Sequence, residues 1–240
     1  MKYAVVTGGT KGIGAGIVSS LLSKGYYVFT NYSSDIENAI YALNQFKKIS
    51  HNIEVIKASQ SSIDEFSKFI AHIKNNSTQI DCIICNAGAT IRKSNMEITN
   101  NEWENVIQVI LNSHYYLIRD LYPLIANNSR IIFIGSMMGI LPHGTSLPYG
   151  VAKSAVHALA KNLVKEFEGT GTTVNAIAPG FVETEWQKNK PLQIRENINN
   201  KTALKRFASI DEITSIVNLC LDNQFINGSL IEVNGGYCFK

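Results

Sequence analysis

The sequence predicts one α/β domain, built on a doubly wound parallel sheet of about seven strands with helices on both faces. Short apolar runs alternate with helical patterns along the chain, which is typical of parallel strands joined by crossover helices. A glycine-rich loop joins the first apolar run to the first helical pattern. The 240 residues are 45% hydrophobic, which is enough for one sizeable core, so we expect residues 1–240 to form a single domain.

The predicted strands are short and apolar, as strands buried on both faces are. They cover residues 2–7, 26–32, 53–58, 80–85, 129–135, 172–178 and 229–233. Helical patterns fill the connections, and three of them open with the Ser/Thr-x-x-Glu sequence of a capping box. These boxes begin at Ser62, Thr99 and Ser209. After the first helix, the predicted helices cover residues 35–49, 63–75, 99–121, 149–167 and 209–221.

The composition excludes several classes of function. The net charge is +3, from 22 basic and 19 acidic residues, so we expect no nucleic-acid partner. No apolar run approaches the ~18 residues of a membrane span, and the first residues do not form a signal peptide, so we expect a cytoplasmic protein without a membrane partner. Cys82 and Cys85 lie in an apolar run at an odd offset, which turns them to opposite faces. We expect buried hydrophobic side chains there rather than a redox pair, and no metal site.

The glycine-rich loop predicts a dinucleotide site. Its spacing is G-x-x-x-G-x-G, in contrast to the G-x-G-x-x-G of the commoner dinucleotide fold. Glycines let the backbone approach a pyrophosphate, and the new helix offers unpaired N–H groups to the phosphates. The residues expected to bind the cofactor here are Gly8, Thr10, Lys11, Gly12, Ile13 and Gly14.

The ends of the next strands extend this predicted site. An acid at the end of the second strand would hydrogen-bond the adenine-side ribose and repel a 2′-phosphate, but the chain has no acid there before Asp35. Lys11 can approach the same phosphate. These two observations favour NADP, and NAD remains possible. The further residues expected to bind the cofactor are Asn31, Tyr32, Ser33, Ser59, Gln60, Asn86, Ala87 and Gly88. The alternative for the last three is an ordinary turn.

Tyr149 and Lys153 are four residues apart in a predicted helix, so they project from one face. A lysine close to a phenol favours the phenolate and lowers its pKa from about 10. Such a tyrosine can give a proton to a carbonyl oxygen and take it back. The alternative, a surface tyrosine packed on a lysine stem, does not account for Ser136, which ends the fifth strand 13 residues earlier.

Two further segments carry candidate residues. Asn112 lies inside a predicted helix, where asparagine has poor propensity and is either exposed or in use, and its apolar neighbours favour use. Residues 185–205 form a polar insertion that is long for a connection and therefore a candidate lid.

The order of these motifs resembles the classical short-chain dehydrogenase/reductase family over essentially the whole chain, and within it most resembles the 3-oxoacyl-(acyl-carrier-protein) reductase group. The resemblance rests on the glycine loop, the Asn-Ala-Gly turn, the Ser, Tyr and Lys residues and the terminal Asn-Gly-Gly. These are residues 7–14, 86–88, 112, 136, 149–153, 179–184 and 234–236.

The resemblance implies a Rossmann fold, a homotetramer, and hydride transfer between the nicotinamide and a carbonyl or secondary alcohol. Tyr149 would protonate the substrate oxygen, Ser136 would position it, and Lys153 would hold the nicotinamide ribose. Asn112 would hold a water that returns the proton through Lys153. The resemblance places Tyr149, Lys153, Pro179, Gly180, Val182 and Thr184 at the cofactor. The substrate would meet Ser136, Met138, His143, Tyr149 and Trp186.

The substrate class stays open at this point. The reductases of that group carry arginines that meet the acidic carrier, and this chain has Asn127 and Thr170 at those positions. A carrier-bound acyl thioester is one reading, and a free small polar molecule, sugar-like or a hydroxy-ketone, is another. A non-catalytic dinucleotide-binding regulator is the alternative from a different class.

Overall fold

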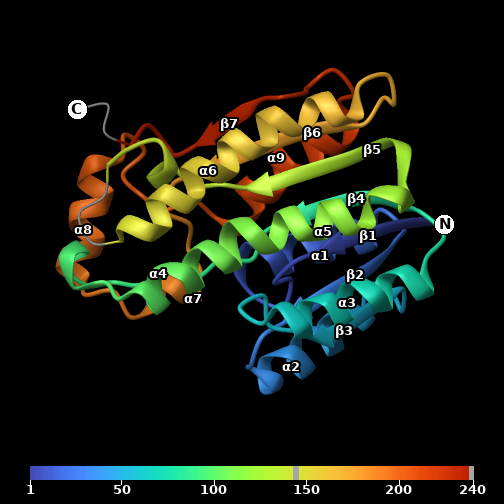
Figure 1. Ribbon diagram of the computed structural model, residues 1–240. Coiled ribbons are helices and arrows are strands. Elements are labelled where there is room, and N and C mark those ends of the chain that lie inside the picture. Colours follow the sequence, from blue (N-terminus) through green and yellow to red (C-terminus); the bar gives the residue numbers. More distant parts are fainter. Residues whose placement is uncertain (143–145, 238–240) are drawn as a thin grey trace.

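The computed structural model describes residues 1–142 and 146–237, and it confirms the predicted fold class (Figure 1). Seven parallel strands form one sheet in the order β3-β2-β1-β4-β5-β6-β7. The strands are β1 Lys2–Val6, β2 Tyr26–Tyr32, β3 Ile53–Lys57, β4 Ile80–Cys85, β5 Ile125–Ile134, β6 Thr173–Pro179 and β7 Leu230–Val233. All of them run towards the side of the molecule where α7 and α8 lie.

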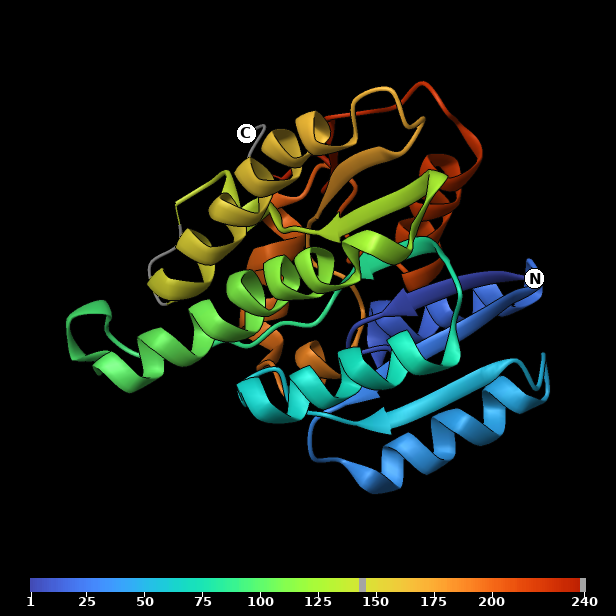
Figure 2. The same ribbon diagram turned by 45° about the vertical axis from the view of Figure 1, so that its right-hand side comes forward.

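Helices cover both faces of the sheet (Figure 2). They are α1 Gly12–Ser23, α2 Ile36–Lys47, α3 Ile63–Asn76, α4 Asn100–Ile107, α5 Ser113–Leu121, α6 Leu147–Leu163, α7 Glu185–Lys188, α8 Leu192–Lys201 and α9 Ile210–Asp222. The first face carries α1, α2 and α9, and the second carries α3, α5 and α6. Because side chains alternate along each strand, the sheet feeds two separate cores. Cys82 packs into the first core and Cys85 into the second, which confirms that they face opposite ways.

The helix predicted over residues 99–121 differs from the structure, because it contains a π-helical turn at Gln108–Asn112. This turn separates α4 from α5. Within it, backbone hydrogen bonds join residues that are five apart along the chain instead of four. Hydrophobic spacing gives no signal for such a turn, and π-turns are frequent at functional sites. The predicted capping boxes are complete at Thr99 and Ser209. At Ser62 only half of the box forms, because the Glu65 carboxylate accepts the N–H of Ser59 instead.

The helix that carries Tyr149 begins two residues earlier than predicted. It starts at Leu147, with Pro148 in its first turn, where the missing N–H has no intrahelical partner to lose. The candidate lid is also more regular than its composition suggests, because α7 and α8 lie within it. In the part of the chain that the structure describes, every helix is too short or too polar to pass through a bilayer.

Two histidines are buried in the helices that cover the second face of the sheet. His114 is on α5 and His157 is on α6, and each has only a few per cent of its surface exposed. Burial lowers the pKa of His114 to about 3 and the pKa of His157 to about 4, and the nearby Lys153 ammonium acts in the same direction. Both rings are therefore neutral in the folded protein at neutral pH.

We predict that these histidines make the fold sensitive to mild acid. Below a pH of ~6.5 the unfolded chain binds protons at both positions and the folded chain does not, so stability falls as the pH falls. The expected slope is roughly 1.4 kcal/mol per pH unit for each histidine between pH ~6.5 and ~5. Urea unfolding at several pH values measures it.

The matched variants are His157→Gln and His51→Gln. The first should remove about half of this slope, because it removes one of two buried titrating groups. His51 is exposed, so its replacement should leave the slope unchanged. A wild-type stability that stays flat from pH 6.5 to 5 would contradict the prediction.

Candidate active site

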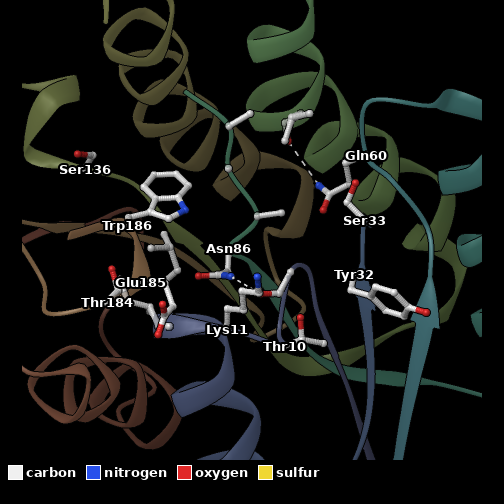
Figure 3. A pocket seen from close by; sticks show the side chains of 18 of the residues that line it. Thr10, Lys11, Tyr32, Ser33, Gln60, Asn86, Ser136, Thr184, Glu185 and Trp186 are labelled. Atoms are coloured by element: carbon white, nitrogen blue, oxygen red, sulfur yellow. Dashed lines mark hydrogen bonds between the residues drawn. The ribbon is translucent and has the colours of Figure 1, made fainter. Parts of the chain in front are cut away.

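A cavity of about 500 Å³ opens at the carboxyl edge of the sheet (Figure 3). It lies beside β1 and β4, adjacent strands from which the chain crosses to opposite sides of the sheet, and such a crevice is the usual ligand site of an open α/β sheet. Most of the predicted residues line it: Gly8, Thr10, Lys11, Gly12, Ile13, Asn31, Tyr32, Ser33, Ser59, Gln60, Asn86, Ala87, Gly88, Ser136, Tyr149, Lys153, Pro179, Gly180, Val182, Thr184 and Trp186.

The backbone of the glycine loop requires glycine at two positions, Gly8 and Gly14. Gly8 has a φ of +63°, in the left-handed region that favours glycine. Gly14 does not line the cavity, but a Cβ there would lie 2.5 Å from Asn86 Nδ2 and closer still to the Gly8 carbonyl oxygen. Its role is therefore to let α1 start close beneath the loop. That start leaves the N-terminal N–H groups of α1 directed at the cavity wall formed by Gly12 and Ile13.

Hydrogen bonds fasten this loop to the end of β4. Thr7 Oγ1 accepts the backbone N–H of Asn86 at 2.9 Å and that of Ala87 at 3.0 Å. The Asn86 side chain donates in return to the carbonyls of Thr7 and Gly8. The Asn-Ala-Gly segment is thus fixed by both its backbone and its side chain, which an ordinary surface turn does not require.

The end of the cavity beside β2 and β3 is rich in hydroxyl groups. Ser33 Oγ donates to Ser59 Oγ at 3.1 Å, and Ser59 Oγ lies 2.7 Å from Ser61 Oγ. Asn31 lines this end, yet its amide is already used: it accepts the Gly8 N–H and donates to the Ala58 carbonyl. Asn31 therefore supports the wall, and the serines offer free hydrogen-bonding capacity.

Lys11 does not stand alone in the cavity, because its ammonium is paired with the Asp35 carboxylate. Asp35 also lines the cavity and caps α2 by accepting the Asn38 N–H at 3.0 Å. The hydrogen bond from Lys11 is the main cause that lowers the pKa of Asp35, and the Asn38 N–H contributes in the same direction. From the sequence, no acid was expected at the end of β2, because none occurs before Asp35. The structure corrects this, because the turn before α2 brings the acid back to Lys11.

Three predicted catalytic residues meet at the end of the cavity opposite the serine hydroxyls. Ser136 follows β5, and its hydroxyl is hydrogen-bonded to the Tyr149 hydroxyl while accepting the Met138 N–H at 3.1 Å. Burial raises the pKa of Tyr149, and the bond with Ser136 acts against that rise. This corrects the prediction of a lowered tyrosine pKa. The Lys153 ammonium lies 5.7 Å from the centre of the phenol ring and is directed to the Ile134 carbonyl, at 2.6 Å.

Lys153 is itself unusual. Its side chain is buried, and burial lowers the pKa of its ammonium to about 8. Among the described residues, the Ile134 carbonyl is the one hydrogen-bond acceptor for its three N–H groups. Burying an ammonium whose N–H groups lack acceptors costs free energy. This position is therefore suited to a ligand whose hydroxyl groups can accept them.

The structure does not bring every candidate to this cavity. The Asn112 side chain lines a neighbouring hollow with Trp103 and donates to Gln108 Oε1 at 3.3 Å. Met138 stays outside the cavity lining and contributes its backbone N–H to Ser136. His143 lies outside the described residues.

Trp186 covers the catalytic end of the cavity. Its ring meets that of Tyr149 edge-on at 6.4 Å, and a Cβ on Gly88 would lie 3.6 Å from the indole. Figure 3 shows it between Ser136 and Asn86. The loop before it also closes on the glycine loop, because a Cβ on Gly12 would lie 3.2 Å from Thr184 Cγ2.

Part of the cavity lining was not predicted from the sequence. Gly135 and Ala89 adjoin predicted site residues, and Ile134 adjoins Gly135, so position along the chain could have indicated them. Asn105 and Val109 come from the α4 region with one-turn spacing, which is common on any helix and carries no signal by itself. The missed residues are Ser34, Asp35, Ser61, Ala89, Asn105, Val109, Ile134, Gly135, Glu185 and Gln187.

Known proteins resemble this chain over nearly its full length. It is 29% identical over 239 residues to the 3-oxoacyl-(acyl-carrier-protein) reductase FabG of Staphylococcus aureus, covering 98% of this chain and 97% of the relative. It is 31% identical over 242 residues to FabG of Aquifex aeolicus, covering 98% and 96%. It is also 29% identical to nodulation protein G of Azospirillum brasilense, covering 100% and 99%.

Solved structures show the same fold. A short-chain dehydrogenase/reductase of Serratia marcescens superposes with a TM-score of 0.92 at 24% identity, covering 99% of this chain and 98% of the other. A short-chain dehydrogenase of Burkholderia cenocepacia, solved with NADP, gives 0.91 at 20% identity, covering 98% and 97%.

The family model for short chain dehydrogenases matches residues 2–195. Together with the cavity at the carboxyl edge of the sheet, this match shows that the chain belongs to the short-chain dehydrogenase family and is an NAD(P)-dependent oxidoreductase.

Proposed function

We propose that the protein reduces a carbonyl group with NADPH, using Tyr149 as the proton donor. One observation carries the proposal: the bonded Ser136 and Tyr149 hydroxyls and the Lys153 ammonium meet at one end of a cavity that the glycine loop also lines. The relatives named 3-oxoacyl-(acyl-carrier-protein) reductase support the same reaction class.

The residues present fit a bound dinucleotide. The glycine loop and the start of α1 would hold its phosphates, and the spare N–H groups of Lys153 would meet the hydroxyls of the nicotinamide ribose. Pro179 and Thr184 would border the nicotinamide. When bound, the nicotinamide supplies the hydride that reduces the carbonyl carbon.

The chain's own residues handle the proton. Because burial raises the pKa of Tyr149, its phenol stays protonated at neutral pH and is ready to donate. Ser136 would donate a hydrogen bond to the same carbonyl oxygen and hold it near the phenol. A tyrosine in this state favours reduction, since oxidation of an alcohol needs the phenolate and should accelerate as the pH rises.

We propose NADPH as the preferred cofactor, with a modest preference. Lys11 and the hydroxyls of Ser33 and Ser59 could bind a 2′-phosphate. Asp35 opposes this, because a phosphate would have to share Lys11 with a carboxylate.

We propose a 3-oxoacyl thioester as the substrate, as in the FabG relatives. A free small polar carbonyl compound is the second candidate, and two observations favour it. Gln187 lines the cavity, and its buried Oε1 has no hydrogen-bond partner among the described residues. Arg130, near the expected carrier surface, is buried and donates to the carbonyls of Asn128, Ser129 and Leu221, so it is not free for an acidic carrier. A homotetramer remains a prediction from the resemblance, and a cytoplasmic location remains a prediction from the composition.

The first test replaces Tyr149 by phenylalanine. Carbonyl reduction should fall by roughly 10²–10⁴-fold, because the proton donor is lost. Dinucleotide binding, measured by nucleotide fluorescence, should stay within about threefold. Tyr41→Phe on the exposed face of α2 is the matched control and should change neither quantity. If the Tyr149 variant reduces the carbonyl at more than a tenth of the wild-type rate, Tyr149 is not the proton donor.

The cofactor preference is tested by Lys11→Ala and Asp35→Asn. Lys11→Ala should weaken NADPH binding by roughly tenfold and leave NADH binding nearly unchanged, because only NADPH carries the 2′-phosphate. Asp35→Asn should tighten NADPH binding by severalfold at low salt. Lys24→Ala breaks the ion pair with Asp222, outside the cavity lining, and serves as the control. Equal binding of NADPH and NADH by the wild type would refute the preference.

The substrate class is tested by comparing a 3-oxoacyl group on acyl carrier protein, the same group on N-acetylcysteamine, and a free hydroxy-ketone. We expect kcat/KM for both thioesters to exceed that for the hydroxy-ketone by at least about tenfold. The reverse order would establish the second candidate. Equal values for the two thioesters would show that the carrier protein is not recognised, as the missing arginines suggest.

A further inference from the structure

His114 is a buried histidine for which the proposed chemistry has no use. It lies on α5, and its ring meets Phe133 of β5 edge-on at 6.4 Å. Only 1% of its surface is exposed. Its Nε2 is 3.1 Å from Thr7 Oγ1, and its Nδ1 has no well-aligned partner among the described residues. A buried polar ring at the end of β1, directly behind the cavity wall, requires an explanation.

The hydrogen bonds of Thr7 determine which ring nitrogen carries the proton. The hydroxyl oxygen already accepts two backbone N–H groups, from Asn86 and Ala87, and these fill both of its lone pairs. Its single proton must therefore be donated. The two acceptors in reach are His114 Nε2 at 3.1 Å and the Ile84 carbonyl at 3.5 Å, which is too long for a good hydroxyl bond.

We infer that His114 is a positioning residue for the dinucleotide site, acting as the neutral tautomer whose Nε2 accepts the Thr7 hydroxyl proton. This bond turns the two lone pairs of Thr7 towards the Asn86 and Ala87 amides and so sets the wall on which the cofactor lies. The inference rests on the proposed function, because it assumes that this wall binds a dinucleotide.

The surroundings of the ring agree with this tautomer. A proton on Nε2 would face an oxygen with no lone pair left to accept it. A doubly protonated ring would add a second charge near Lys153, the charged group that acts on His114 electrostatically. The Ile110 carbonyl, one turn earlier in the π-helical segment, acts on the ring as an acceptor, and since Nε2 meets Thr7 this favours a proton on Nδ1.

The inferred tautomer is tested first without any cofactor. Nitrogen-15 NMR of the imidazole distinguishes a protonated nitrogen from a bare one. At neutral pH we expect His114 to show a bare Nε2 and a protonated Nδ1. Thr7→Ser keeps the hydroxyl and should preserve this pattern, whereas Thr7→Val should change the Nε2 signal. A protonated Nε2 in the wild type would overturn the inference, whatever the protein's reaction proves to be.

The effect on the cofactor is tested by a matched pair of amides. Gln at position 114 can place its oxygen near the position of Nε2, whereas Asn can reach only the position of Nδ1. We expect His114→Gln to bind NADPH within about threefold of wild type and His114→Asn to bind roughly tenfold more weakly, because Thr7 then lacks its acceptor. kcat at saturating cofactor should fall much less than binding does.

Two results would count against the role. Equal weakening by Gln and Asn, with equal loss of stability towards urea, would show that the ring acts by packing alone. Loss of kcat without loss of cofactor binding would place His114 in the chemical step instead. If neither cofactor binds the wild-type protein, the proposed function fails, and the NMR result still decides the tautomer.

Discussion

The hydrogen bonds between the ends of β1 and β4 are the constraint on which the rest of the site depends. Two adjacent parallel strands end here, and the chain leaves them in opposite directions, so a crevice opens between them. The Thr7 hydroxyl and the Asn86 amide fasten its two walls together. With the walls fixed, the glycine loop and the start of α1 face one side of the cavity and the catalytic helix faces the other.

Much of this arrangement could be predicted from sequence because its causes are local. Alternation along strands, glycines at a tight turn and a tyrosine and lysine one helical turn apart all act within a few residues. What could not be predicted depends on contacts between distant segments. Asp35 returns to Lys11 because of the path of one turn. Asn112 lies in a π-helical turn that hydrophobic spacing does not predict, and it lines a neighbouring hollow instead of the cavity. The raised pKa of Tyr149 depends on burial, which only the packed structure reveals.

Lys153 connects these observations, because it is a positive charge within a neutral interior. Burial is the main cause that lowers the pKa of His114 and His157, and the Lys153 charge acts on both in the same direction. The two histidines in turn serve as neutral acceptors: His114 lies by the Thr7 hydroxyl, and His157 accepts the Ser136 N–H at 3.3 Å. One ammonium therefore helps to fix the protonation state of the rings that hold both walls of the site, the cofactor wall and the wall that carries Ser136.

The same charge explains why the site should remain incomplete until a ligand enters. Inside the protein, Lys153 has one carbonyl for three donors, and burial already lowers its pKa to about 8. A ligand that brings hydroxyl oxygens to this position would stabilise the ammonium and raise its pKa again. The ammonium would then stay charged beside the phenol of Tyr149, 5.7 Å from its ring centre, where a positive charge opposes the effect of burial on the phenol pKa. The dinucleotide that we propose for this cavity would therefore stabilise the charge that lies beside the proposed proton donor.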